Sequence, residues 1–210
     1  MTILYLMRHS EPFKPHRGIE EVAEDILFAN IKTPLSIKGE KISEKLSKSS
    51  EFDNLDTVWS SDYVRCMSTA KYFAEKNNLK VNISNKLGEI KHGVSKCEDL
   101  PLDFEIHQLE DENYKIGKGE SRKETRERLL EKILFLLKEH KDQRLLVVGH
   151  STAFAYLLDN WCTISYDSDY KFKDNIFFDG KWNYCETFKL IFDDQLNLID
   201  IENLKNCLED

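Results

Sequence analysis

Two histidines and two arginines of this sequence could together handle an anionic group. Arg8 directly precedes His9, Arg65 follows four residues after Ser61, and His150 lies far downstream. A neutral imidazole nitrogen is a competent nucleophile near pH 7, and the forked donors of arginine match the oxygens of a phosphate. No acidic metal-binding partner stands among these residues. The residue types therefore favour a metal-independent site for a phosphate-like anion.

Taken one at a time, these residues have more ordinary explanations. A histidine at the end of a strand is more often a partly buried side chain with a satisfied hydrogen bond than a catalyst. A single arginine more often forms a surface ion pair, which contributes little to stability. The functional interpretation therefore depends on whether the fold brings the groups together.

A short, mostly apolar run stands just before each of three places in the chain, namely Arg8-His9, the segment Ser61 to Arg65, and His150. The runs cover residues 3–7, 56–60 and 145–149. Runs of this kind are typical of strands that are buried on both faces of a parallel sheet. The carboxyl ends of such strands meet at one edge of an open α/β sheet, where ligands bind. We therefore expect the side chains that follow the runs to converge at that edge.

Helical patterns lie between the apolar runs. They cover residues 36–49, 62–77 and 121–140 and the segment that follows His150. Ser36 stands at the N-cap position of the first, and Ser121 and Glu124 form a capping-box pattern at the start of the third. Because strands and helices alternate, the sequence predicts an α/β fold of three layers, with helices on both faces of a mostly parallel sheet.

Near the C-terminus the pattern changes to that of antiparallel strands. Asp179-Gly180 lies between Phe177-Phe178 and a run that alternates over residues 184–192. The dipeptide Asp-Gly favours a type I′ turn, so we expect a C-terminal hairpin that turns at these two residues. Aromatic residues are frequent between 161 and 184. Core packing is the default interpretation of them, and the interface of a homodimer is the alternative.

The length and composition suit one domain, 1–210, with a small insertion at about 94–118. A content of 40% hydrophobic and 32% charged residues is that of an ordinary globular protein. The insertion is acidic and the least patterned part of the chain. Either it forms a loop or a partly helical lid near the site, or it is a solvated excursion with no role.

Charge and cysteine usage restrict the partners and the location. The net charge of −8 argues against nucleic acid or an anionic membrane as a partner, because the repulsion is long-ranged. Five cysteines without a C-x-x-C spacing suggest neither a disulfide framework nor a zinc site. The apolar run at the N-terminus is too short for a signal peptide or a membrane span. We therefore expect a cytoplasmic protein with reduced thiols.

Six ordered motifs resemble those of the histidine phosphatase superfamily, also called the phosphoglycerate mutase-like superfamily. They are LYLMRHSEP at 4–12, LSIKG at 35–39, WSSDYVRCMSTA at 59–70, LGEIKHG at 87–93, GES at 119–121 and VVGHS at 147–151. The resemblance runs over nearly the whole chain up to about Phe154. It implies a phosphoglycerate mutase-like fold and activity on a small phosphorylated metabolite, without cofactor or metal.

The resemblance also implies roles for individual residues. The catalytic set is His9, Glu89 and His150, and the substrate-binding set is Arg8, Arg65, Ser10 and Ser151. His9 is then the phosphate acceptor and Glu89 the proton donor. A carboxyl group with this task needs a pKa raised toward neutrality by partial burial or by a nearby carboxylate. The alternative for Glu89 is a solvated loop carboxylate, which the surrounding motif LGEIKHG disfavours.

The chain departs from the family pattern beside both histidines. Ser10 stands where the family most often has glycine, and Ser151-Thr152 replaces a small glycine-rich turn. The loop after the first motif lacks the asparagine that many members use as a phosphate contact. Three nearby residues either replace that contact or are simply exposed, namely Lys14, His16 and Arg17. The natural substrate is therefore left open.

Three functions are compatible with these motifs. Mutases of the superfamily usually carry a longer insertion before the long helix, whereas the insertion 94–118 is short and acidic. This favours a phosphatase that hydrolyses phosphate monoesters through a phosphohistidine. The alternatives are a phosphoglycerate mutase-type transfer and a non-catalytic module that binds phosphorylated ligands. The nucleophile and the acid together count against the binding module, because anion binding needs neither.

Overall fold

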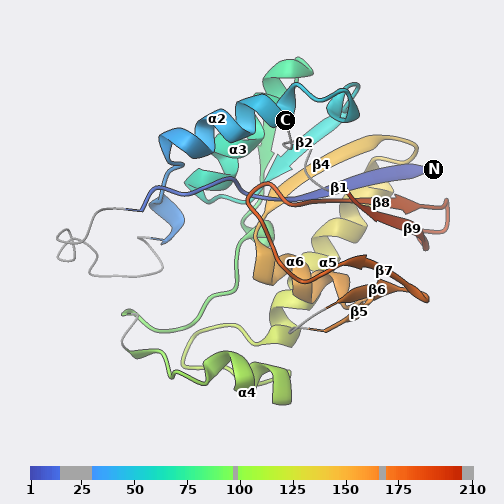
Figure 1. The fold of residues 1–210 in the computed structure, drawn as a ribbon. Coiled ribbons are helices and arrows are strands. Elements are labelled where there is room, and N and C mark those ends of the chain that lie inside the picture. The colour runs from blue at the N-terminus through green and yellow to red at the C-terminus, as the bar shows by residue number, and fades with distance from the viewer. Residues whose placement is uncertain (15–29, 97–98, 166–168, 205–210) are drawn as a thin grey trace.

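A six-stranded sheet forms the centre of the part of the chain that the computed structural model describes, which is residues 1–14, 30–96, 99–165 and 169–204. The strands follow the order β3-β2-β4-β1-β8-β9 (Figure 1). Their bounds are β1 Thr2–Arg8, β2 Thr57–Ser60, β3 Val81–Ile83, β4 Arg144–Gly149, β8 Thr187–Phe192 and β9 Leu198–Asn203. The first four are mutually parallel, whereas β8 runs antiparallel to both β1 and β9.

Helices cover both faces of this sheet. They are α2 Ile37–Ser47 and α3 Val64–Lys76 on one face, and α5 Arg122–Glu139 and α6 Ser151–Leu158 on the other (Figure 1). The short helix η1, Ser50–Phe52, follows α2, and η2, Asn85–Leu87, follows β3. The predicted three-layer α/β fold with a mostly parallel sheet is therefore confirmed.

The central strand β1 contributes to the cores on both faces. Leu4 and Leu6 pack with α5 and α6, while Tyr5 and Met7 pack with α2 and α3, and all four are fully buried. Side chains alternate between the two faces of a strand, so a continuous apolar run is what a doubly covered strand requires. Burying each such side chain stabilises the fold by about 1.5–3 kcal/mol. This burial fixes the position of the carboxyl end of β1, which His9 directly follows.

The predicted helix starts are also present. The Ser36 hydroxyl accepts a hydrogen bond from the Gly39 amide at 2.9 Å at the start of α2. At the start of α5, Ser121 and Glu124 form the reciprocal bonds of a capping box at 3.0 and 3.1 Å. These bonds satisfy amides that would otherwise lack partners, so the sequence places both helix starts within a residue or two.

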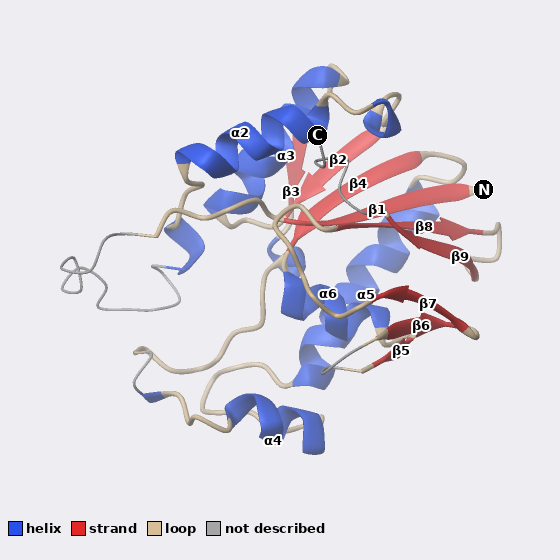
Figure 2. Cartoon of the chain, viewed as in Figure 1, coloured by secondary structure: helices blue, strands red, loops and turns tan. Residues whose placement is uncertain are grey.

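A second, three-stranded antiparallel sheet lies beyond α6 (Figure 2). Its strands are β5 Thr163–Ile164, β6 Tyr170–Phe172 and β7 Asn175–Phe178. The predicted hairpin turn at Asp179-Gly180 is wrong, because β7 and β8 on either side of it belong to different sheets. The C-terminal hairpin of the main sheet is instead formed by β8 and β9.

The insertion 94–118 contains one short helix, α4 Phe104–Glu110, and lies apart from the main sheet (Figure 2). Phe104 and Gln108 are its buried residues. Among the described helices, none is both long and apolar enough to cross a membrane. Of the five cysteines, those within the described ranges, Cys66, Cys162 and Cys185, are buried free thiols.

Candidate active site

The ends of three neighbouring parallel strands bring the predicted groups together. β4 lies between β1 and β2, and Arg8 pairs with Gly149 while Ser60 pairs with Val148. The residues that follow these strands therefore meet at one edge of the sheet. The rings of His9 and His150 lie edge to face with their centroids 5.4 Å apart.

His9 is a buried imidazole with one ring nitrogen committed. Its Nδ1 lies 2.7 Å from the backbone carbonyl of Ser10. A carbonyl can only accept, so Nδ1 carries the proton and Nε2 keeps its lone pair. Burial, together with the charges of Arg65 and Arg8, lowers the pKa of His9 from 6.5 to about 3. The side chain is therefore a neutral imidazole at physiological pH, as a nucleophile must be.

His150, the N-cap of α6, is fully buried and has both ring nitrogens engaged. Its Nδ1 lies 3.2 Å from Nη2 of Arg65, and a guanidinium can only donate. The proton of the neutral ring is therefore on Nε2, which lies 3.0 Å from the hydroxyl of Ser61. Burial holds the pKa of His150 well below 6.5, and His9 and Arg65 add to the effect.

The two arginines bring positive charge to the buried histidines. Arg65, in the first turn of α3, also donates to the carbonyl of Asn30 at 2.6 Å. Arg8 donates to the carbonyl of Trp182 at 2.7 Å. The Nε of Arg8 is buried, and it has no hydrogen-bond partner within the described residues. Neither arginine forms a salt bridge with a described residue. Burial lowers the pKa of Arg8. A buried cationic cluster whose arginines lack a salt bridge within the described residues is a ready site for an anion.

Glu89 reaches the same edge of the sheet from the loop after η2. Its Oε1 accepts hydrogen bonds from the amides of Ala153, at 2.8 Å, and Ile90, at 3.1 Å. Ala153 belongs to the first helical turn after His150, so this hydrogen bond attaches the carboxyl group to the helix that begins at the second histidine. Burial raises the pKa of Glu89, while the backbone hydrogen bonds and the charge of Arg65 oppose that rise.

The remaining predicted residues have different surroundings. The hydroxyl of Ser10 donates to the carbonyl of Gly39 at 2.8 Å, and its amide donates to the Thr69 hydroxyl at 3.0 Å. Ser10 therefore ties the end of β1 to α2 and α3. Lys14 is exposed. His16 and Arg17 lie outside the described residues.

A cavity of about 310 Å³ lies between α4, α6 and the second sheet, and the two residues that follow His150 are part of its lining. It is lined by Glu105, Ile106, Leu109, Ser151, Thr152, Ala155, Tyr156, Tyr170, Gly180 and Trp182. Ser151 and Thr152 directly follow His150, and the carbonyl of Trp182 holds Arg8. Sequence reasoning identified Ser151 but missed Glu105 and Trp182, because no motif marks residues that reach the site from an insertion and a loop.

Comparisons with known proteins agree with this geometry. The family model of the histidine phosphatase superfamily, branch 1, matches residues 4–175. Phosphoserine phosphatase 1 of Hydrogenobacter thermophilus is 27% identical in an alignment over 162 residues, and the match covers 72% of this chain and 72% of that protein. The prediction of a phosphatase from this superfamily is confirmed at this level.

Solved structures show that the fold is shared. A mutant phosphoserine phosphatase from Entamoeba histolytica, in complex with phosphoserine, has a TM-score of 0.67 at 17% identity, covering 96% of this chain and 97% of its own. A mycobacterial glucosyl-3-phosphoglycerate phosphatase in complex with VO3 has a TM-score of 0.68 at 17% identity, covering 96% and 98%. The family model spans well over half of the sequence, and the chain belongs to the histidine phosphatase superfamily, branch 1.

Proposed function

We propose that this protein hydrolyses the phosphate monoesters of small metabolites through a phosphohistidine formed on His9. One observation carries the proposal. His9 is a buried, neutral imidazole whose Nδ1 is committed to a carbonyl, beside two arginines that form no salt bridge with a carboxylate of the described residues. A phosphate dianion supplies the negative charge that this cluster lacks, and Nε2 of His9 is the atom available for attack.

In the first step, Nε2 of His9 attacks phosphorus and the bond from phosphorus to the ester oxygen breaks. The proton of Glu89 passes to the leaving oxygen, so the product departs as an alcohol. Arg8 and Arg65 bind the three remaining oxygens, on which the charge of the transition state is spread, and His150 joins them by turning its Nε2 proton from Ser61 to the phosphoryl group. Most of the rate enhancement then comes from positioned positive charge.

In the second step, water attacks the phosphohistidine. The Glu89 carboxylate takes a proton from that water, the bond from phosphorus to Nε2 breaks, and inorganic phosphate leaves. Glu89 ends protonated and His9 ends neutral, so the enzyme returns to its starting state. A carboxyl group that alternates in this way needs a raised pKa, and burial raises the pKa of Glu89.

Hydrolysis fits the surroundings better than transfer to a second hydroxyl of the substrate. A mutase must retain a highly charged intermediate, whereas here Glu105 on the short insertion lines the adjoining cavity and would repel it. The cavity of about 310 Å³ is suited to the part of a small substrate that is not phosphate. The phosphatases among the relatives act on substrates of this general kind, as the names phosphoserine and glucosyl-3-phosphoglycerate phosphatase state.

The proposal places the enzyme in the cytoplasm, without nucleic acid or membrane as a partner. All the groups named in the two steps come from one chain, so the proposed steps use no residue of a second copy. A homodimer remains a hypothesis that sedimentation of the purified protein would test.

Hydrolysis of p-nitrophenyl phosphate tests the proposed function. We expect turnover that persists in EDTA and that vanadate blocks, because vanadate mimics the five-coordinate transition state and binds more tightly than product. Absence of turnover at every pH from mildly acidic to neutral would favour the binding module. Loss of activity in EDTA, restored by magnesium, would refute the metal-independent mechanism.

A further inference from the structure

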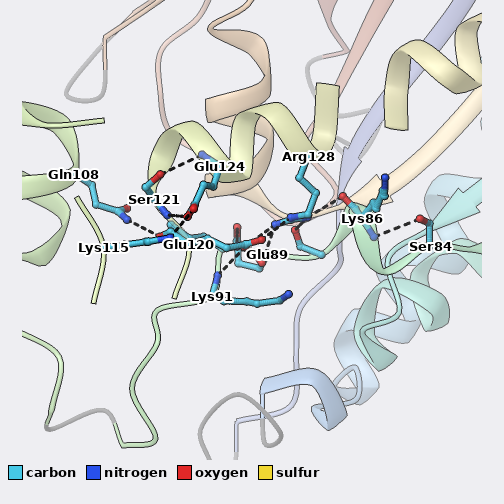
Figure 3. A network of polar contacts seen from close by, with 12 residues as sticks. Ser84, Lys86, Glu89, Lys91, Gln108, Lys115, Glu120, Ser121, Glu124 and Arg128 are labelled. Atoms are coloured by element: carbon cyan, nitrogen blue, oxygen red, sulfur yellow. Dashed lines mark hydrogen bonds and ion pairs between the residues drawn. The ribbon is translucent and has the colours of Figure 1, made fainter. Parts of the chain in front are cut away.

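Arg128, on the long helix α5, forms a two-point ion pair with Glu120 (Figure 3). Its Nε lies 2.7 Å from one carboxylate oxygen of Glu120, and its Nη2 lies 2.8 Å from the other. Both side chains are largely buried, with exposed fractions of 15% and 14%. An ion pair with this planar, two-point geometry fixes the orientation of both side chains in addition to pairing their charges.

The same guanidinium binds the backbone of the loop that carries Glu89. Its Nη1 donates to the carbonyls of Lys86, at 2.7 Å, and Gly88, at 3.2 Å, and Nη2 lies 3.5 Å from the carbonyl of Glu89 itself (Figure 3). These carbonyls stand at the end of η2, where carbonyl groups lack helical partners. The Arg128 side chain thus supplies hydrogen-bond donors to the backbone carbonyls of the turn from which Glu89 extends.

Glu120 completes the attachment from the other side of the loop. Its carboxylate accepts a hydrogen bond from the Lys91 amide at 3.2 Å, and its own amide donates to the Lys91 carbonyl at 2.7 Å. Gln108 on α4 donates to the carbonyl of Glu120 at 3.0 Å. The loop 86–91 is therefore bound on both sides of Glu89.

We propose that Arg128, paired with Glu120, is a positioning residue that holds Glu89 where it can protonate the leaving oxygen. This inference rests on the proposed role of Glu89. Arg128 acts on the backbone of the loop and does not touch the reacting atoms. Proton transfer depends steeply on geometry, and a displacement of the order of 1 Å can cost about 10²-fold in rate.

The test compares Arg128→Gln with Arg126→Gln, a control on the same helix. Arg126 is similarly buried and pairs with Glu112 and Asp159, away from the Glu89 loop. With glycerol 2-phosphate, an alkyl ester, we expect kcat of Arg128→Gln to fall about 10- to 100-fold with little change in KM. Formation of the phosphoenzyme from p-nitrophenyl phosphate should change less than about threefold, since that leaving group needs no proton. The control should match the wild type on both.

A conservative variant separates geometry from charge. Lysine keeps the positive charge but is a compact point charge without the planar fork. Arg128→Lys should therefore lose alkyl phosphate turnover nearly as severely as Arg128→Gln. Full activity of Arg128→Lys, or equal losses on both substrates in Arg128→Gln, would overturn the positioning role. If Arg128→Gln does not fold, Glu120→Gln decides the question by the same split, with a smaller loss expected.

Glu89→Gln distinguishes failure of this inference from failure of the proposed function. If Glu89→Gln shows the leaving-group dependence and Arg128→Gln does not, only the positioning role fails. If Glu89→Gln itself shows no such dependence, Glu89 is not the acid and both fail. In the double variant Arg128→Gln/Glu89→Gln, we expect no loss beyond that of Glu89→Gln, because the position of the loop no longer affects proton transfer once the acid is absent.

Discussion

At the scale of single residues, Glu89 shows how opposing effects set a proton affinity. Burial favours the neutral carboxyl group, whereas the amides of Ile90 and Ala153 favour the carboxylate, and burial prevails so that the pKa is raised. The same two amides hold the carboxyl group in place, because its Oε1 accepts a hydrogen bond from each of them. Glu89 therefore combines a fixed position with a raised pKa, and both are needed by a general acid.

The leaving group reveals whether Glu89 is that acid. We expect Glu89→Gln to reduce hydrolysis of alkyl phosphates by about 10²- to 10⁴-fold, because an alkoxide leaves poorly without a proton. Phosphoenzyme formation from p-nitrophenyl phosphate should be far less affected, and slow turnover should follow a burst of nitrophenol. Pre-steady-state assays on both substrates measure this. Equal losses in phosphoenzyme formation would mean that Glu89 positions phosphate or supports the fold.

The pH dependence of kcat/KM gives an independent reading of the same proton. Glu89 must be protonated to act as the acid, so activity on an alkyl phosphate should fall as pH rises through its raised pKa. His9 should cause no loss as pH falls through 6.5, because its pKa is lowered to about 3. The ratio of wild type to Glu89→Gln cancels the ionisation of the substrate. A ratio that stays constant on the basic side would contradict the assignment.

At the scale of elements, two chain segments approach too closely for side chains. A Cβ on Gly93 would lie 2.0 Å from the carbonyl oxygen of Ile116, and the backbone φ of +80° is left-handed. A Cβ on Gly119 would lie 2.7 Å from the carbonyl of Lys91. The glycines of the motifs LGEIKHG and GES thus let the Glu89 loop lie against the segment that leads into α5.

Gly93→Ala should therefore cost more stability than a positive φ alone explains. Gly117→Ala is a matched control, since φ is +52° there and the nearest atom would be 3.2 Å away. We expect about 1–2 kcal/mol lost in the control from its left-handed backbone, and clearly more in Gly93→Ala. Urea unfolding of both variants measures the difference. An equal or smaller loss in Gly93→Ala would show that the segments separate freely.

Sequence patterns predicted these elements unequally. The sequence segments that form β1, β2 and β4 are apolar because helices cover both faces of the sheet. Their pattern therefore clearly indicates buried strands. The turn at Asp179-Gly180 was predicted wrongly because local turn chemistry says nothing about which strand a segment pairs with. Phe178 packs edge to face on Phe188 at 5.0 Å without any pairing between β7 and β8. Tertiary packing there overrides the local hairpin signal.

Part of the candidate site could likewise be read from the sequence. His9, Arg65 and His150 follow directly from strand ends and helix starts, which patterns locate well. The contacts of Arg8 with Trp182, and of Arg128 with the Glu89 loop, join positions far apart in the chain and depend on how loops pack. No spacing rule predicts such contacts.

At the scale of the whole molecule, burying two neutral histidines links stability to pH. The unfolded chain binds protons on His9 and His150 below about pH 6.5, whereas the folded protein holds both pKa values lower. The stability that depends on these two neutral histidines is therefore complete above pH 6.5 and declines as pH falls below it. For His9 the decline continues toward about pH 3, at about 1.4 kcal/mol per pH unit. The raised pKa of Glu89 acts in the opposite direction, since the folded state gains that proton first.

His9→Gln should therefore flatten the acid side of the stability profile. We expect the free energy of unfolding of the wild type, relative to this variant, to fall by about 1.4 kcal/mol per pH unit below 6.5. His107→Asn is the control, because the side chain of His107 is 43% exposed and belongs to no part of the site. Urea titrations in phosphate-free buffer measure all three proteins. Parallel profiles for the wild type and His9→Gln would show that His9 is not held neutral.

The central claim, that His9 accepts the phosphoryl group, is tested most directly by trapping the intermediate. Wild-type protein mixed with a radiolabelled phosphate ester and rapidly quenched should carry label on His9, in a linkage that is labile in acid and stable in base. His9→Ala should carry none. Label that survives acid and is released by base, located on Ser10 or Ser61, would contradict the account and place the nucleophile on a hydroxyl group.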